Sequence, residues 1–202
     1  MKKLQQLDKK LKLITEIFLD TRECYNYCRY FYTPQNDEEL NLLNYDIHLQ
    51  FIRHALWRQT VIEISKLICD KENDKFNINS FIRSLKPNGH YSFLKVPESK
   101  IKDWELSIIN NIGVINNILK LRNKIFAHTD PNKEDYQKIV VTFSSIEKIL
   151  KILTDILKEV YLAIHCDLDL SEPESENIRM LSLLVAHRKL EYNEIVRKYN
   201  ER

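Results

Sequence analysis

The chain has 202 residues, of which 44% are hydrophobic and 30% charged, the ordinary balance of a globular protein large enough to bury a core. Its net charge of +2 gives no overall bias toward nucleic acid or membrane, so any basic site must be local. The two glycines are too few for a glycine-rich phosphate loop or for a sheet built on tight hairpins.

Five prolines mark the boundaries between segments with helical apolar spacing, because proline inside a helix costs about 3 kcal/mol. The first segment predicts a helix over residues 3–32, which ends in a cluster of aromatic residues. We interpret these aromatic side chains as packing surface, and base stacking against RNA is the alternative.

A second helix is predicted over residues 36–69, where a capping box marks its start. It carries Arg53 and Arg58 close to Trp57, so these arginines are candidates for contacts with RNA phosphates. The alternative for both is the solvated face of a long helix.

The rest of the chain predicts further helices. A short helix is predicted over residues 80–85, and a long helix, loosened at Gly113, over residues 99–127. A fifth helix with the clearest apolar stripe is predicted over residues 130–165, since aspartate followed by proline is a typical helix start. The last helix is predicted over residues 174–199.

These segments predict an all-α protein, an antiparallel helical bundle of about five long helices plus a short one. No internal repeat or low-complexity tract divides the chain. We expect a single helical domain over residues 1–202, whose core spans about residues 36–165. The helices at residues 3–32 and 174–199 are expected to pack on that core.

Location and metal content are also bounded by the sequence. No apolar run approaches the roughly 20 residues that span a bilayer, and the N-terminus lacks the apolar stretch of a signal peptide. We therefore expect a cytoplasmic protein with no membrane partner and with reduced cysteines. Cys24 and Cys28 lie one helical turn apart, but no Cys-x-x-Cys motif or nearby histidine pair completes a zinc site. No metal and no cofactor are expected.

A local basic patch lies late in the helix predicted over residues 99–127. No acidic residue occurs between Glu105 and Asp130, although the chain has 29 acidic residues. The cationic or titratable side chains in this window belong to Lys120, Arg122, Lys124 and His128.

The segment Arg122-Asn123-Lys124-Ile125-Phe126-Ala127-His128 resembles the signature of the HEPN superfamily. That signature is an arginine, a polar residue directly after it, and a histidine that follows four to six intervening residues. The continuation through Asp130 is similar to the version found in abortive-infection HEPN proteins. The resemblance covers about residues 36–165.

The resemblance implies a metal-independent endoribonuclease, a toxin or abortive-infection effector in defence. It implies a homodimer with the motif at the interface, in which Arg122 and His128 are catalytic and Asn123 assists them. An antitoxin or a defence-system protein is a candidate partner. Toxins paired with a nucleotidyltransferase often carry tyrosine two residues after the histidine, where this chain has Asp130, which argues against that antitoxin.

The chemistry of these residue types fits RNA cleavage by the 2′-hydroxyl group. Histidine titrates near neutral pH and can accept or donate the proton, while arginine stays charged and binds phosphate oxygens in a fork. The further candidates for RNA binding are Lys120, Lys124, Arg58 and Arg53.

The spacing of the motif points to a site shared between two chains. Six residues of an ideal helix turn about 600°, so Arg122 and His128 would lie about 120° and about 9 Å apart. A symmetric dimer would bring two copies of the motif together across a two-fold axis.

Two other interpretations stay open. One is a non-catalytic HEPN module that binds RNA, a nucleotide or a protein partner, since a fold does not decide function. The other is a structural helical protein in which His128 caps its helix and Arg122 pairs with an acid of a neighbouring helix.

Overall fold

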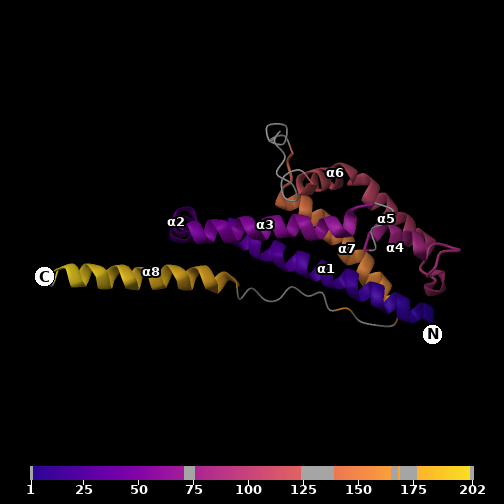
Figure 1. Ribbon diagram of the computed structural model, residues 1–202, viewed down its shortest axis with the longest axis horizontal. Helices are drawn as coiled ribbons and strands as arrows, with labels where there is room; N and C mark the ends of the chain where they lie inside the picture. The colour runs from indigo at the N-terminus through magenta and orange to yellow at the C-terminus, as the bar shows by residue number, and fades with distance from the viewer. Residues whose placement is uncertain (1, 71–75, 124–138, 165–167, 169–176, 201–202) are drawn as a thin grey trace. The chain divides into compact units, whose positions relative to one another are not determined.

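The computed structural model describes residues 2–70, 76–123, 139–164, 168 and 177–200. These residues form eight α-helices and one short 3-10 helix, without a strand, which confirms the predicted all-α class (Figure 1). The elements are α1 (Lys2–Tyr32), α2 (Asp37–Tyr45), α3 (Ile47–Ile68), α4 (Ile78–Leu85), η1 (Ser92–Leu94), α5 (Glu98–Asn110), α6 (Ile112–Leu121), α7 (Phe143–Ala163) and α8 (Asn177–Asn200).

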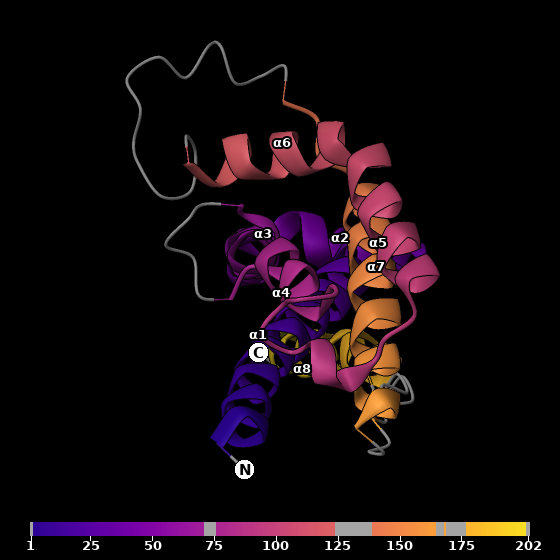
Figure 2. The same cartoon turned by 90° about the vertical axis from the view of Figure 1, so that its right-hand side faces the viewer.

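The helices group into two compact units. The first, called the motif unit below, consists of residues 1–24 and 58–170. The second, called the α8 unit, consists of residues 25–57 and 171–202. Helices α1 and α3 contribute residues to both units, and Figure 2 shows α3, α5, α6 and α7 from another side. A single domain over residues 1–202 stays a prediction.

The core of the motif unit is aliphatic. Helix α7 presents the apolar stripe that the sequence predicts, and α1, α3, α4, α5 and α6 each bury one face. Two polar contacts tie helices together at its edges: Thr15 Oγ1 lies 3.1 Å from the Tyr161 hydroxyl, and Lys100 Nζ lies 2.6 Å from Glu159 Oε1. The buried residues of the α7 stripe are Ile146, Ile149, Leu150, Leu153, Ile156, Leu157 and Val160.

The α8 unit has a smaller core where α1 ends. Tyr30 and Phe31 of α1 are buried there, so packing is the role of these aromatic residues. The Leu181 backbone N–H donates to the Tyr30 hydroxyl over 2.8 Å, and Ser182 Oγ donates to Glu39 Oε1 over 3.1 Å. These bonds hold α8 against α1 and α2. The remaining core residues are Leu42, Leu43, Leu49 and Leu181, with Leu56 and Val185 packed against them.

The helix predicted over residues 36–69 is interrupted at Asp46. Its predicted start is confirmed, since the Asn36 side chain accepts from the Glu39 N–H over 2.8 Å, although Glu39 Oε2 accepts from the Gln35 N–H instead of the Asn36 N–H. At Asp46 the carboxylate Oδ1 accepts from the backbone N–H of His48 and Leu49. Asp46 therefore caps the N-terminus of α3. Its own backbone is extended, as is usual for a cap residue, and this extended residue ends α2.

The helix predicted over residues 99–127 is also interrupted, at Asn111 and not at Gly113. The Asn111 side chain donates to the Ser107 carbonyl over 2.8 Å, which is the acceptor that the Asn111 backbone N–H would use in a continuous helix. The backbone N–H of Asn111 instead bonds Ile108, one residue closer. Helix α6 ends at Leu121, and residues 124–127 lie outside the described part of the chain.

The helix predicted over residues 130–165 begins later, at Phe143. Thr142 and Ser145 form a capping box at this start, in which each side chain bonds the backbone N–H of the other. Residues 139–142, which the prediction placed inside this helix, are not helical. The predicted start at Asp130 lies outside the described residues.

We predict that Asp46→Ala lowers the free energy of unfolding by about 1 kcal/mol, because the cap of α3 and the 2.7 Å ion pair with Arg188 are both lost. Urea unfolding followed by circular dichroism would measure this change. Asp46→Asn is the matched control, since asparagine also caps helices. An equal loss in both variants would contradict the capping role.

The same carboxylate gives this stabilisation a pH dependence. The Leu49 N–H holds the pKa of Asp46 below its ordinary value, with smaller effects from the His48 N–H and Arg188. A lowered folded-state pKa stabilises the fold above the unfolded-state pKa, and this contribution is lost as the pH falls through the folded-state pKa. The difference in free energy of unfolding between the native chain and Asp46→Ala should therefore become smaller as the pH falls.

Candidate functional site

The described part of the predicted motif is Arg122-Asn123, directly after α6. Helix α6 is anchored by one buried face formed by Ile115, Ile118 and Leu121. After Leu121 the backbone widens into a π-helical turn at Arg122 and Asn123. Such turns are rare and frequently occur at functional sites.

Arg122 and Asn123 contact each other directly. Arg122 Nη1 donates to Asn123 Oδ1 over 3.0 Å, and both side chains are half-buried. An arginine has five N–H donors in a planar fork, so this bond engages one of them and fixes the plane of the rest. The amide oxygen of Asn123 is used as the acceptor, so its NH₂ group is turned away from the guanidinium as a second donor. The pair is suited to an anion such as phosphate.

The other half of the motif lies outside the described residues. His128, Lys124 and Asp130 all fall in the range 124–138. The described residues on either side of this range meet beside α6, because Asn117 Nδ2 lies 3.5 Å from the Val140 carbonyl oxygen. The predicted 120° separation of Arg122 and His128 assumed an α-helix through residue 128, whereas α6 ends at Leu121.

The remaining candidates for RNA binding lie in different places. Lys120 is exposed in the last turn of α6, and Arg58 is exposed on α3 in the same unit. Arg53 belongs to the α8 unit, where its guanidinium carbon lies 4.9 Å from the centre of the Tyr32 ring. This cation–π contact holds Arg53 on the aromatic end of α1. The structure thus joins Arg122 to Asn123 and gives Arg53 a separate contact.

A pocket of about 590 Å³ lies in the motif unit beside α6, and the sequence did not indicate it. Its wall includes six isoleucines, which come from α3, α4, α5 and α6, and Asn116 and Leu119 of α6 contribute to it. Two ion pairs stand among its lining residues, Arg83 with Asp70 at 2.8 Å and Lys86 with Glu105 at 2.6 Å. Only packing reveals this pocket, because its isoleucines come from segments far apart in the chain.

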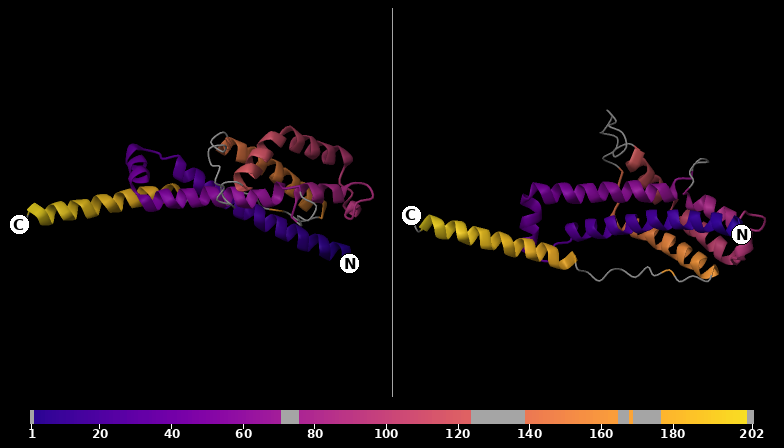
Figure 3. Two further views of the ribbon diagram at one scale, coloured as in Figure 1. Left: turned by 45° about the horizontal axis from the view of Figure 1, so that its top comes forward. Right: turned by 60° about the horizontal axis from the view of Figure 1, so that its bottom comes forward.

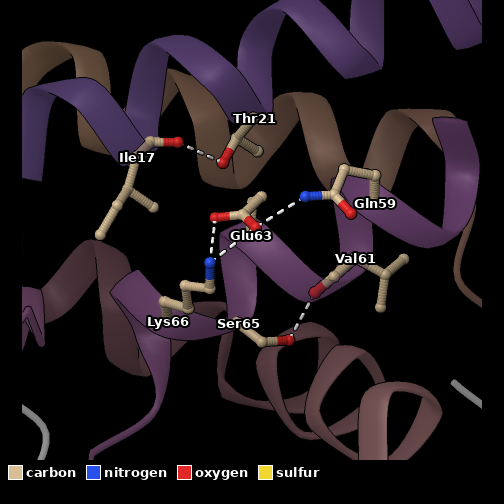
Figure 4. Close-up of polar contacts among 7 residues, drawn as sticks. All are labelled: Ile17, Thr21, Gln59, Val61, Glu63, Ser65 and Lys66. Carbon is tan, nitrogen blue, oxygen red and sulfur yellow. Dashed lines mark hydrogen bonds and ion pairs between the residues drawn. The ribbon is translucent and has the colours of Figure 1, made fainter. Parts of the chain in front are cut away.

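A buried carboxylate on α3 was also missed. Figure 4 shows Glu63 between Gln59 and Lys66 of the same helix. Gln59 Nε2 donates to Glu63 Oε1 over 2.7 Å, and Lys66 Nζ lies 2.6 Å from the same oxygen. The i, i+3 and i, i+4 spacing was the signal that could have found this cluster. Its three members neutralise and satisfy one another, so a structural role accounts for them.

The thiol of Cys24 is not suited to nucleophilic chemistry. Burial raises the pKa of Cys24, and the nearby carboxylates of Asp20, Glu23 and Glu63 raise it further. A thiol with a raised pKa stays protonated, whereas the thiolate is the nucleophile.

Across the described residues, no three His, Cys, Asp or Glu side chains gather as metal ligands would. None of the helices searched in that part of the chain is long and apolar enough to cross a membrane.

We predict that Lys66→Met lowers the free energy of unfolding by about 1–2 kcal/mol, because it leaves the Glu63 carboxylate, whose side chain is 8% exposed, without its cation. Urea unfolding would measure the loss. The double variant Glu63→Gln/Lys66→Met should recover most of it, since the neutral amide needs no cation. A double variant as unstable as Lys66→Met would show that the ion pair is not the cause.

The chain matches a known protein family over most of its length. A model of the AbiU2 family, HEPN_AbiU2, matches residues 4–182 of the chain. The match spans both units and confirms the HEPN resemblance of the abortive-infection type. No curated protein and no solved structure matches the chain. The catalytic roles of Arg122, Asn123 and His128 stay predictions.

Proposed function

The chain belongs to the AbiU2 family of HEPN proteins, and from this premise we propose that it is a metal-independent endoribonuclease. It acts in the cytoplasm as a toxin or abortive-infection effector and cleaves RNA. The observation that supports this most is the Arg122–Asn123 pair, a guanidinium held by a neighbouring amide in a stretch of chain without acidic residues.

The reaction needs one proton removed and one proton supplied. The 2′-oxygen of the RNA forms a bond to phosphorus while the bond from phosphorus to the 5′-oxygen breaks. His128 transfers the protons, from the 2′-hydroxyl group and to the leaving 5′-oxygen. Arg122 binds the phosphate oxygens and stabilises the charge that develops on them. The products are a 2′,3′-cyclic phosphate and a 5′-hydroxyl end.

Asn123 has a positioning role in this proposal. Its Oδ1 holds Arg122 Nη1, so the guanidinium is oriented before RNA binds. Lys120, which is exposed two residues before Arg122, supplies further contacts to phosphates, together with Lys124 and Arg58. Two copies of the motif meet in a homodimer, which gives each site its second half, and an antitoxin or defence-system protein is the proposed regulator.

We predict that the purified protein cleaves total RNA in the presence of EDTA and leaves 2′,3′-cyclic phosphate ends. His128→Ala and Arg122→Ala should each reduce the cleavage rate about 100-fold or more, because each removes a group that acts on the transition state. Asn123→Ala should reduce it less. Gel analysis of the RNA with mapping of the new ends would measure these rates.

The matched control is Lys102→Ala, which removes an exposed cation on α5 and should leave the rate unchanged. Cleavage that survives both His128→Ala and Arg122→Ala would refute the assigned site. Loss of cleavage in EDTA would refute the metal-independent mechanism. RNA binding that needs Arg122 but gives no cleavage would favour the non-catalytic HEPN module.

We predict that Lys120→Ala weakens binding of single-stranded RNA at all sequences to a similar degree, because a phosphate contact carries no sequence information. The slope of log affinity against log salt should fall by about 0.7, the value for one lost phosphate contact. Fluorescence anisotropy in a His128→Ala background keeps the RNA intact during the measurement. A slope equal to that of Lys102→Ala would exclude Lys120 from the RNA path.

A further inference from the structure

Helix α8 has one half packed in its unit and one half uncovered among the described residues. Its N-terminal half contacts α1 and α2, where Leu181 is buried and Val185 is partly buried. Its C-terminal half runs on past α2 (Figures 1 and 3). There Tyr192, Ile195 and Tyr199 are 68%, 66% and 80% exposed.

The covered and uncovered halves belong to one stripe. Leu181, Val185, Arg188, Tyr192, Ile195 and Tyr199 follow one another at alternating spacings of four and three residues. This is the spacing by which a helix presents a continuous seam to a partner helix. The seam is filled by α2 in its first part, and the same seam continues unfilled in its second part.

The uncovered half of the seam is complementary to itself. The segment Tyr192-Asn193-Glu194-Ile195-Val196-Arg197-Lys198-Tyr199 has tyrosine at both ends and β-branched aliphatic residues at its centre. A two-fold axis between Ile195 and Val196 would place Tyr192 opposite Tyr199 of the partner subunit. A two-fold interface requires a patch of this kind, which is its own complement.

The charges beside the seam fit the same arrangement. Glu191 and Lys198 are seven residues apart, so they lie on one flank of α8 about 10 Å from each other. In the antiparallel pair, Glu191 comes within about 3 Å, measured along the axis, of the partner's Lys198. The two-fold axis repeats this attraction, so two opposite-charge pairs form per dimer.

A groove in the α8 unit lies where the C-terminal end of the partner's α8 would pack. It has a volume of about 510 Å³, and its apolar lining comes from Leu42, Tyr45, Val185 and Tyr192. Tyr45 is 80% exposed at its edge. In the antiparallel register the partner's Tyr199 lies level with Tyr192, so the groove receives that aromatic ring.

We propose that two copies of this chain pair through antiparallel α8 helices, with the two-fold axis between Ile195 and Val196 and with Tyr199 of each copy in the groove of the other. This interface lies in the α8 unit, whereas Arg122 and Asn123 lie in the motif unit. It does not rest on the proposed ribonuclease activity and should persist when His128 is replaced.

The test is the mass of the full chain in solution, measured by light scattering after size exclusion. Ile195→Glu should halve the mass of the native chain. Leu190→Glu is the matched control: Leu190 is 64% exposed, and it lies on the same helix about 140° around the axis from Ile195. It should leave the mass unchanged. Circular dichroism checks that both variants keep their helix content.

A monomeric native chain, or equal masses for the native chain, Ile195→Glu and Leu190→Glu, would overturn the proposal. A dimer that is lost with Arg122→Ala but kept with Ile195→Glu would place self-association at the motif only, which also overturns it.

A charge exchange tests the register. Glu191→Lys and Lys198→Glu should each raise the dimer dissociation constant about fivefold, because like charges then face each other twice per dimer. The double variant should restore the native constant. Within one chain the two residues are too far apart to pair, so restoration requires contact between copies. A double variant as weak as the single variants would refute the antiparallel arrangement.

Discussion

The carboxylate of Asp46 makes three contacts on which the α8 unit depends. Two backbone N–H groups of α3 bond to it, and the guanidinium of Arg188 pairs with it. The first two turn the chain between α2 and α3, so that α2 leaves the direction of α3 and presents its own face. The third holds α8 on that face. One short side chain therefore ends α2, caps α3 and adds an ion pair to the bonds from Tyr30 and Glu39 that hold α8.

The same kind of interaction gives the candidate site its place in the motif unit. Asn111 ends α5 by bonding the Ser107 carbonyl, and α6 then begins as a separate helix with its own buried face. Arg122 follows the last buried residue of that helix directly. The guanidinium is thus fixed at two points, by the anchored helix before it and by the Asn123 amide after it.

The all-α class and the α7 stripe could be predicted because they depend on local periodicity, and the cap at Asn36 because its chemistry is local too. The breaks at Asp46 and Asn111 could not, because aspartate and asparagine are tolerated inside helices as well as at caps. Arg122 and Asn123 could be identified from the sequence, because they belong to a recognisable motif. The surroundings of Glu63 and the isoleucine-lined pocket depend on tertiary packing, which no local pattern encodes.

The break at Asn111 also bears on how freely the chain can vary in length. In a continuous helix, each residue inserted into α5 would rotate everything after it by about 100°, and Arg122 would lose its direction. Because α6 is a separate helix of 10 residues with its own anchor, such a rotation ends at Asn111. Insertions or deletions can therefore change the length of α5 while Arg122 keeps its orientation, so the scaffold can vary in length independently of the site.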